Sequence, residues 1–409
     1  MLIPSPQQKA HEARSVLSGA ALVVLILVAL LAGCAGQPVT PEMGGGISKA
    51  MLLEGKPILK GGSMPVMPDA DLLHMTPEMK AFVDFYVDSA GPPAARLLQL
   101  QSAIIHNPNF RLDYTSHTFT AADTFKYGYG NCLSFTNLFV AMSRYLGLRA
   151  KYQEVDIPIT WDHEGGTMVL NRHINIYVKT DQAGRGLGHS TQVIDFNTTD
   201  VKDSYDTQRI SDRRAAAHYY SNIGIDFLQR GQYRNAFAYM RKGLLIDPTF
   251  HDLWINLGAL YSRSGALDFA ERAYLEAVRH DRSMIALSNL ARVYEQMGEP
   301  ARADQYRREV ARFRAKNPYY RFQVARKAID EGNLGEAVQN LQAAIRLKPA
   351  EDEFHFWLGV AYLKLGEAEK ARSVLHEAQQ LAGDEQLKVR YRNKIKLLEK
   401  GATPSALAG

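Results

Sequence analysis

The stretch Tyr129-Gly130-Asn131-Cys132-Leu133-Ser134-Phe135-Thr136-Asn137 places a cysteine directly after a glycine-containing turn. Beyond it, apolar residues recur at three- and four-residue spacing, which predicts a helix with one buried face. These residues are Phe135, Leu138, Phe139, Met142, Tyr145 and Leu146, and Gly147 follows as a stop signal. Cys132 therefore lies at a helix start, where unpaired backbone N–H groups and the helix dipole favour its nucleophilic thiolate form. The alternative is a small cysteine buried in a core.

The composition is that of an ordinary globular protein. The chain has 409 residues, of which 46% are apolar and 22% charged, and this length predicts two or three domains. The net charge of +5 is mild, and no zinc-finger or aromatic-basic pattern predicts a nucleic-acid partner. The histidines show no ligand spacing, so the sequence predicts neither a metal site nor a cofactor.

The first 33 residues have the pattern of an export signal. Lys9 and Arg14 precede an apolar run at residues 20–31, which is short for a membrane span. The run ends in Leu31-Ala32-Gly33-Cys34, which resembles the lipobox of bacterial lipoproteins. An uncleaved N-terminal anchor helix is the alternative, but it leaves the small residues before the cysteine unexplained.

The lipobox resemblance implies a location for the mature protein. In that family the cysteine, here Cys34, becomes the first residue of the mature chain and takes acyl chains that anchor it to a membrane. Ala35 resembles the class sorted to the outer membrane, so the resemblance implies a lipid-anchored protein of the bacterial cell envelope that faces the periplasm. Thiols normally pair there, and with Cys34 acylated, Cys132 has no partner cysteine in the chain. A lone thiol in such a compartment is either used or shielded.

The next segments divide into a linker and a folded domain. Residues 34–76 are rich in Gly, Pro and Met and show no lasting periodicity, which predicts a tether. Residues 77–205 then predict an α+β domain. Pro77 opens a helix, another helix covers about 94–105, and Thr120 is a candidate N-cap.

After Gly147 the apolar period changes from 3.6 to 2, which predicts strands. One strand covers about residues 150–155. Another is His173-Ile174-Asn175-Ile176-Tyr177-Val178, with its isoleucines facing the core and His173 on the other side. A third strand, Val193-Ile194-Asp195-Phe196, is expected to run antiparallel to it. If these two strands pair, His173 and Asp195 lie side by side on one face.

This order of residues resembles the transglutaminase-like superfamily, relatives of the papain-like proteases. The shared features are a cysteine at a helix start, a histidine in a strand and an aspartate in the next strand. The turn Tyr129-Gly130-Asn131-Cys132 is similar to the family's aromatic-Gly-x-Cys turn. The resemblance implies that Cys132 is the nucleophile, His173 the base and Asp195 the residue that orients the histidine. The Cys132 backbone N–H is the expected oxyanion donor, and a second donor stays open among Asn131, Tyr129 and other residues.

Some residues depart from the family pattern or compete with it. Leu133 stands where the animal cross-linking enzymes carry Trp, and Asn175 stands where many members have an aromatic residue. Both departures argue against protein cross-linking, while hydrolysis of an amide and acyl transfer to a small acceptor stay open. His163 competes with His173 for the role of base, but it lies in a segment without a strand pattern.

The second half of the chain, residues 213–382, repeats itself about five times. Glycines recur at steps of 34, 33, 34 and 34 residues, at Gly231, Gly265, Gly298, Gly332 and Gly366. With the stretch Trp254-Ile255-Asn256-Leu257-Gly258 and Tyr261, this period resembles a tetratricopeptide repeat. In such repeats small residues let two helices approach, and each unit stacks on the next. Residues 312–318 are expected to prolong the second helix of the third repeat.

The expected fold is an α+β transglutaminase-like, papain-like domain followed by an all-α tetratricopeptide-repeat solenoid, with a capping helix and tail in residues 383–409. Two functions follow as hypotheses. The first is a lipid-anchored thiol hydrolase or acyltransferase whose repeats bind a protein substrate or partner on their concave face. The second is an envelope scaffold or adaptor that acts through its repeats and has no catalytic activity. The binding role of the repeats rests on the resemblance of fold alone.

Overall fold

The computed structural model describes residues 46–67, 69–157, 172–180, 191–196, 205–383 and 385–399. The expected signal peptide at residues 1–33, the expected lipidation site Cys34 and the competing base His163 lie outside the described residues. No helix in the described ranges is both long and apolar enough to cross a membrane.

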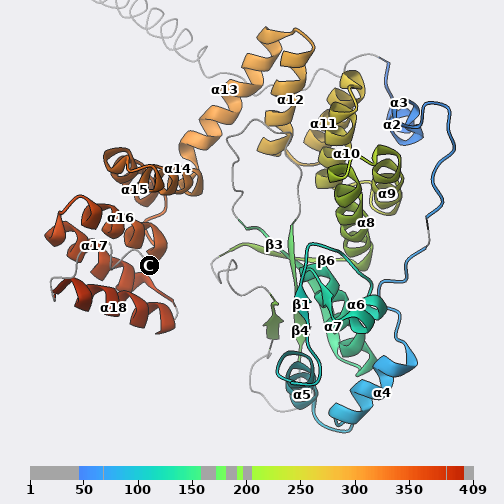
Figure 1. Cartoon of the computed structure of the whole chain (residues 1–409), viewed down its shortest axis with the longest axis horizontal. Helices are drawn as coiled ribbons and strands as arrows, with labels where there is room; N and C mark the ends of the chain where they lie inside the picture. Colours follow the sequence, from blue (N-terminus) through green and yellow to red (C-terminus); the bar gives the residue numbers. More distant parts are fainter. Residues whose placement is uncertain are drawn as a thin grey trace, which may run out of the picture. The chain divides into compact units, whose positions relative to one another are not determined.

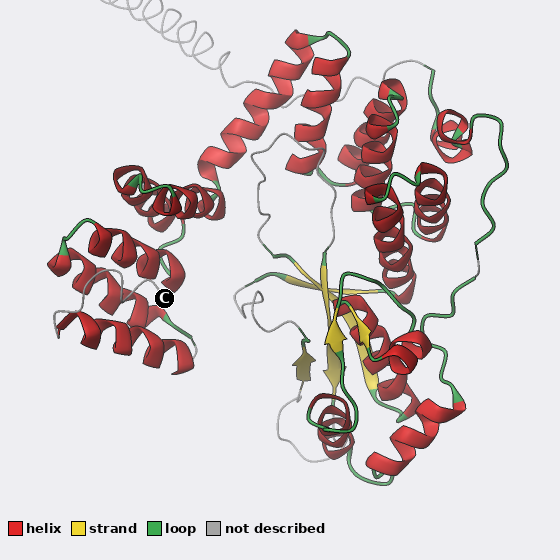
Figure 2. Ribbon diagram, in the orientation of Figure 1, coloured by secondary structure: helices red, strands yellow, loops and turns green. Residues whose placement is uncertain are grey.

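The first half of the described chain combines helices with a four-stranded sheet (Figures 1 and 2). The helices are α4 (Pro77–Tyr86), α5 (Pro93–Ile105), α6 (Ala121–Tyr127) and α7 (Cys132–Tyr145). The sheet has the order β5-β4-β3-β6, and its strands are β5 (Thr191–Ile194), β4 (His173–Lys179), β3 (Arg149–Val155) and β6 (Thr207–Ile210). Neighbouring strands in it are antiparallel. A separate parallel pair precedes α7 and consists of β1 (Asp113–Tyr114) and β2 (Tyr129–Gly130).

Helix α7 is the central element of this domain because it contacts strands β3 and β4 as well as helices α4, α5 and α6. The sequence predicts one buried face, but every residue from 132 to 143 is buried. Two of the buried polar side chains bond to backbone carbonyls. Thr136 Oγ1 donates to the Ile174 carbonyl at 3.2 Å, and Asn137 Nδ2 donates to the Phe119 carbonyl at 3.0 Å. The first bond ties the helix of the cysteine to strand β4.

Local signals in the sequence place several of these elements correctly. Thr120 caps α6, because its hydroxyl oxygen accepts from the Asp123 N–H at 3.2 Å. Helix α4 begins at Pro77 as predicted.

Strand β6 is not predicted, because its residues are mostly polar and exposed, as suits an edge strand. Its pairing with β3 carries the sheet past residue 205, the domain boundary expected from the sequence.

The second half of the described chain consists of helical hairpins (Figure 1). The hairpins are α8–α9, α10–α11, α12–α13, α14–α15 and α16–α17, and α18 packs against α17. Their bounds are α8 (Asp212–Gln229), α9 (Tyr233–Ile246), α10 (His251–Arg263), α11 (Leu267–His280), α12 (Met284–Gln296), α13 (Pro300–Lys316), α14 (Pro318–Asp330), α15 (Leu334–Leu347), α16 (Asp352–Lys364), α17 (Ala368–Leu381) and α18 (Glu385–Glu399).

The recurring glycines follow the first helix of each hairpin. From Gly231 to Gly366 they have φ between 71° and 82°, a left-handed conformation that favours glycine. Gly258 instead allows α10 and α11 to pack closely, because a Cβ there would lie 2.6 Å from the ring of Tyr274. Helix α13 has 17 residues against 14 in α9, α11, α15 and α17, so the second helix of the third hairpin is longer, as predicted. The extension ends at Lys316, before the predicted end at residue 318, because Pro318 begins α14.

Part of the expected tether is folded. Helices α2 (Lys49–Glu54) and α3 (Lys56–Leu59) pack against α11 and α9. Leu52 has no exposed surface, and its carbonyl accepts from the Tyr261 hydroxyl at 2.5 Å. Between the two helices Gly55 has φ 70°, and it lies so close to an aromatic ring of α9 that a Cβ would overlap the ring. The sequence pattern does not reveal this docking, because the apolar residues span too few positions to show a helical period.

Candidate active site

The helix of Cys132 begins with a capped turn. The Asn131 Oδ1 atom accepts from the Ser134 N–H at 3.1 Å, and the Asn131 carbonyl accepts from the Phe135 N–H at 3.1 Å. The Asn131 Nδ2 atom donates to Thr118 Oγ1 at 2.6 Å. These bonds engage the Asn131 amide and hold the first turn of α7. Cys132 is the first residue of this capped helix.

His173 and Asp195 meet on one face of the sheet. Strands β4 and β5 pair with Ile176 opposite Ile194, so Asp195 follows directly after the end of β5, across from Asn175. The His173 Nε2 atom is 2.8 Å from both carboxylate oxygens of Asp195. His173 is 8% exposed, and the side chain of Asp195 is 13% exposed. The structure therefore brings together the histidine and the aspartate that the sequence places on one face.

The imidazole of His173 also interacts with the Cys132 thiol. Burial lowers the pKa of His173, but the hydrogen bonds with Asp195 and Cys132 outweigh burial and raise this pKa to about 9. Because Asp195 occupies Nε2, Nδ1 is the ring nitrogen left for the thiol. At neutral pH the ring is therefore a charged imidazolium. Cys132 is a free cysteine with 9% of its surface exposed.

The sequence does not predict that Asn175 belongs to the site. In the sequence this residue is only a departure from the family pattern. Its Nδ2 atom donates to Asp195 Oδ2 at 2.9 Å, and the residue is 2% exposed. Its Oδ1 atom is buried and has no hydrogen-bond partner among the described residues, which is uncommon for a buried polar atom. The alternation of side chains along the strand could have indicated this role, because it places Asn175 on the same face as His173.

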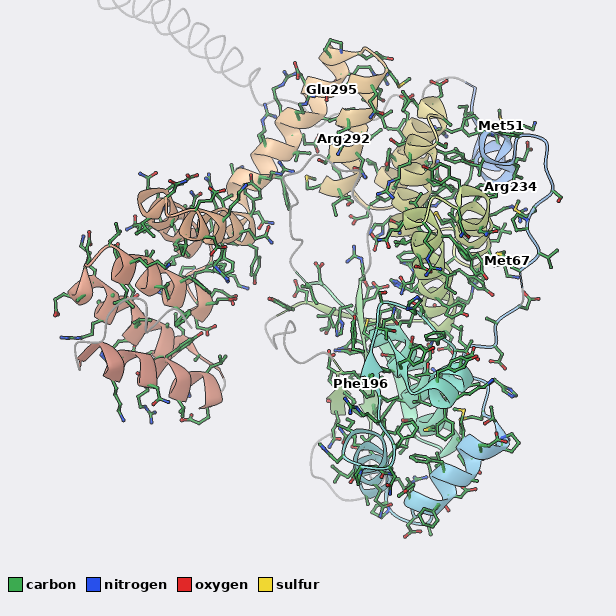
Figure 3. All side chains as sticks on the ribbon, viewed as in Figure 1. Met51, Met67, Phe196, Arg234, Arg292 and Glu295 are labelled. Carbon is green, nitrogen blue, oxygen red and sulfur yellow. The ribbon has the colours of Figure 1, made fainter. Side chains whose placement is uncertain are left out.

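The residue after Asp195 packs against aromatic rings of α7. Phe196, which is labelled in Figure 3, has ring centroids 5.5 Å and 6.0 Å from those of Phe135 and Phe139. These contacts anchor the chain just beyond β5 and so hold the carboxylate in place.

The site thus combines a thiol, a base and a carboxylate, which are the groups of nucleophilic catalysis. Across the described part of the chain, no three His, Cys, Asp or Glu side chains gather as a possible metal site.

Profiles of known families match both halves of the chain. The profile of the transglutaminase-like superfamily matches residues 80–174, which include Cys132 and His173. Tetratricopeptide-repeat profiles match residues 286–317, 327–366 and 352–385.

Individual relatives resemble parts of the chain. It is 31% identical over 72 residues to the uncharacterized protein ycf37 of Guillardia theta, a match that covers 18% of this chain and 40% of that relative's length. A part of the chain matches the structure of YrrB, a tetratricopeptide-repeat protein with an unusual peptide-binding site, at 21% identity over 43% of this chain and 92% of that one, with a TM-score of 0.24. The pilF protein of Pseudomonas aeruginosa matches at 19% identity over 48% of this chain and 90% of its own, with a TM-score of 0.25. On the profile matches, the chain contains a transglutaminase-like domain followed by tetratricopeptide repeats.

Proposed function

We propose that the transglutaminase-like domain is a thiol active site that cleaves or transfers the acyl group of an amide. The observation that carries the proposal is the surroundings of the His173 ring. Its Nε2 atom lies 2.8 Å from Asp195, and the interactions of the ring with Asp195 and Cys132 raise its pKa to about 9. The imidazole of His173 thus interacts with both a thiol and a carboxylate, and these are the three groups that nucleophilic catalysis needs.

In the proposed reaction the Cys132 thiolate attacks the carbonyl carbon of the amide, and the carbonyl oxygen takes the negative charge near the Cys132 N–H. The His173 imidazolium gives its proton to the leaving nitrogen, the C–N bond breaks, and an amine departs from a thioester on the sulfur. Water or a small amine, deprotonated by His173, then attacks the thioester and restores the thiolate and the imidazolium. Asp195 orients the ring and stabilises its positive charge.

The acceptor that we favour is water or a small amine. Leu133 and Asn175 depart from the pattern of the cross-linking enzymes, and the Asn175 amide here binds the Asp195 carboxylate. These departures support hydrolysis or transfer to a small acceptor over the cross-linking of proteins.

The proposal includes a location. The Leu31-Ala32-Gly33-Cys34 pattern supports a mature chain anchored by acyl chains on Cys34, and Ala35 supports the outer membrane, facing the periplasm. The amide substrate would then belong to the cell envelope, and the repeats would hold a protein substrate or partner near the site.

A simple activated ester tests the proposed chemistry. With p-nitrophenyl acetate we expect a burst of about one p-nitrophenolate per chain, because acylation of a thiolate is fast and deacylation is slower. Intact mass spectrometry should show an acetyl group on Cys132. Cys132→Ala should abolish both signals, whereas Cys34→Ala should preserve them. A burst that survives Cys132→Ala would rule out this thiol as the nucleophile.

A second candidate function, the binding of an acidic peptide by the repeats, is favoured by a cavity of about 530 Å³ lined by α12, α13 and α14. In the described structure its charged lining residues are Arg292, Arg307, Arg314, Arg321 and Glu295 (Arg292 and Glu295 are labelled in Figure 3). Glu295 already pairs with Arg307 at 2.6 Å, and Arg321 bonds to two neutral oxygens. Excess positive charge in a concave surface attracts anions, and guanidinium groups suit carboxylates.

Fluorescence anisotropy with a dye-labelled oligoglutamate peptide tests this second function. We expect Arg292→Glu and Arg321→Glu each to weaken binding by about ten-fold or more, because each replaces an attractive charge by a repulsive one. The matched control is Arg308→Glu, which changes an exposed arginine of α13 outside the cavity lining. Equal weakening by all three variants would mean that the peptide responds only to net charge.

A further inference from the structure

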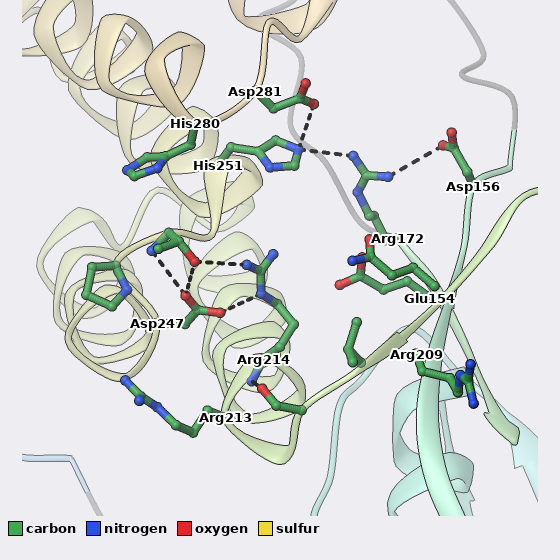
Figure 4. A pocket seen from close by; sticks show the side chains of 15 residues that line it. Glu154, Asp156, Arg172, Arg209, Arg213, Arg214, Asp247, His251, His280 and Asp281 are labelled. Atoms are coloured by element: carbon green, nitrogen blue, oxygen red, sulfur yellow. Dashed lines mark hydrogen bonds and ion pairs between the residues drawn. The ribbon is translucent and has the colours of Figure 1, made fainter. Parts of the chain in front are cut away.

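The sheet and the first repeats, which belong to one unit of residues 43–409, meet at a cavity of about 840 Å³ (Figure 4). It is lined by residues of β3 and β6, by Arg172 directly before β4 (His173–Lys179), and by residues of α8, the α9–α10 turn and the end of α11. Charged side chains there pair with one another, as Arg214 does with Asp247 at 2.5 Å. Polar groups from both the sheet and the first repeats thus line this junction.

Two buried polar contacts join the sheet to the repeats. His218 Nε2 of α8 lies 2.6 Å from Glu154 Oε1 of β3, and the two side chains are 3% and 13% exposed. Arg172 contacts both carboxylate oxygens of Asp252, whose side chain is 1% exposed. His251 Nε2 also lies 2.9 Å from Asp252. Asp252 is thus a fully buried carboxylate in the first turn of α10, with partners on both sides of the junction.

Arg172 and Asp252 are both charged. Burial raises the pKa of Asp252, but the hydrogen bonds from His251 and Arg172 outweigh it and bring this pKa well below its usual value. Burial lowers the pKa of Arg172, while the hydrogen bond with Asp252 and the nearby carboxylates raise it above its usual value. A charge pair out of water keeps its geometry, because separation would leave an unpaired buried charge.

Both polar contacts involve residues next to His173 in the sheet. Arg172 directly precedes His173 in the chain, and Glu154 pairs in register with Ile174, the residue that follows it. The repeats therefore hold β4 directly through Arg172 and hold the neighbouring β3 through Glu154, at the end of the sheet that carries the histidine.

We propose that Asp252 is a positioning residue for the thiol site: by fixing Arg172, it holds the start of β4 where His173 reaches both Cys132 and Asp195. The inference rests on the proposed function of the domain. The second repeat is then part of the support of the site, and the reactivity of Cys132 depends on the contact between β4 and α10. Misplacement of a reacting group by about 1 Å costs roughly 100-fold in rate, so a small shift of Arg172 is enough.

Alkylation of Cys132 by iodoacetamide from about pH 5 to pH 9 tests the proposal, in the full chain with Cys34→Ala so that one thiol remains. We expect Asp252→Asn to lower the rate at pH 6 by about ten-fold or more, and to move the pH dependence toward that of an ordinary thiol. The matched control is Asp281→Asn, which removes another carboxylate of the same cavity, 3.2 Å from His251. Its rate should stay within about two-fold of the wild type.

A second variant, Arg172→Lys, keeps the charge but removes the planar fork that binds both oxygens, and we expect it to act in the same direction. Circular dichroism establishes that each variant is folded at the temperature of the assay. Unchanged profiles in the folded variants, or a loss of equal size at every pH, would overturn the positioning role. A wild-type profile that already matches an ordinary thiol would instead overturn the proposed function of the domain.

Discussion

Replacing His173 by alanine is expected to lower the rate of Cys132 alkylation at pH 6 by between about 10-fold and 100-fold. In the wild type the His173 imidazolium, with a pKa of about 9, interacts with the Cys132 side chain. His173→Ala removes this positive charge, and a free thiol in general is only about 0.3% ionised at pH 6. The measurement is the second-order rate constant with iodoacetamide in the Cys34→Ala background.

The pH dependence of the alkylation rate distinguishes the wild type from His173→Ala. The pH dependence of the wild-type rate should change near pH 9, where the imidazolium loses its proton. The His173→Ala rate should rise about ten-fold for each pH unit until it levels off above about pH 8.5. The control is His163→Ala, which removes the competing base and should keep the wild-type profile. If His163→Ala had the effect expected of His173→Ala, the role of base would move to residue 163.

Replacing Trp254 by alanine is expected to destabilise the second hairpin by about 3–5 kcal/mol, because it leaves a large cavity in a packed core. Trp254 has no exposed surface, and its Nε1 atom donates to the Pro248 carbonyl at 2.9 Å. The ammonium of Lys49 in α2 lies 4.9 Å from its ring centroid, so the change also removes a contact with the docked N-terminal helix. Such a loss is a large part of the roughly 5–15 kcal/mol that stabilises a domain, and urea unfolding followed by circular dichroism measures it.

Trp357 provides a matched control in the last hairpin. It is partly exposed on α16, and the Arg326 guanidinium lies 3.4 Å from its ring centroid. Alanine there removes surface contacts more than core packing, so we expect a loss of about 1–2 kcal/mol. Because repeat arrays couple mainly neighbouring units, the two losses should affect different parts of the unfolding curve. Equal losses would contradict the packing described for Trp254.

Features that depend on local sequence are predictable here. Thr120 marks the start of α6 because a side-chain cap needs only the next three residues. The period-2 pattern from His173 predicts β4, and the face assignment places His173 beside Asp195. The repeat glycines are recognisable because one turn with positive φ recurs at a constant spacing.

Features that depend on distant partners are not predictable in the same way. Residues 207–210 form an edge strand because they pair with the edge of β3 that β4 does not occupy. Their polar sequence does not predict this pairing. From its sequence position in the first turn of a helix, Asp252 is expected to lie at the surface and to interact with the helix dipole. It is buried instead, because it pairs with Arg172, 80 residues away. The amide of Asn175 acquires its role from a carboxylate on the adjacent strand.

The central claim is that Cys132, His173 and Asp195 act together through one imidazole, and the most direct test is an NMR titration of that ring. Histidine ring labelling of the full chain, with His173→Ala to assign the resonance, gives the pKa of His173. We predict a value of about 9 in the wild type. Removal of both partners by Cys132→Ala and Asp195→Asn should bring it down to about 6.5 or below, because only the opposing effect of burial is then left. A wild-type His173 that titrates near 6.5, and does not respond to either replacement, would contradict the account.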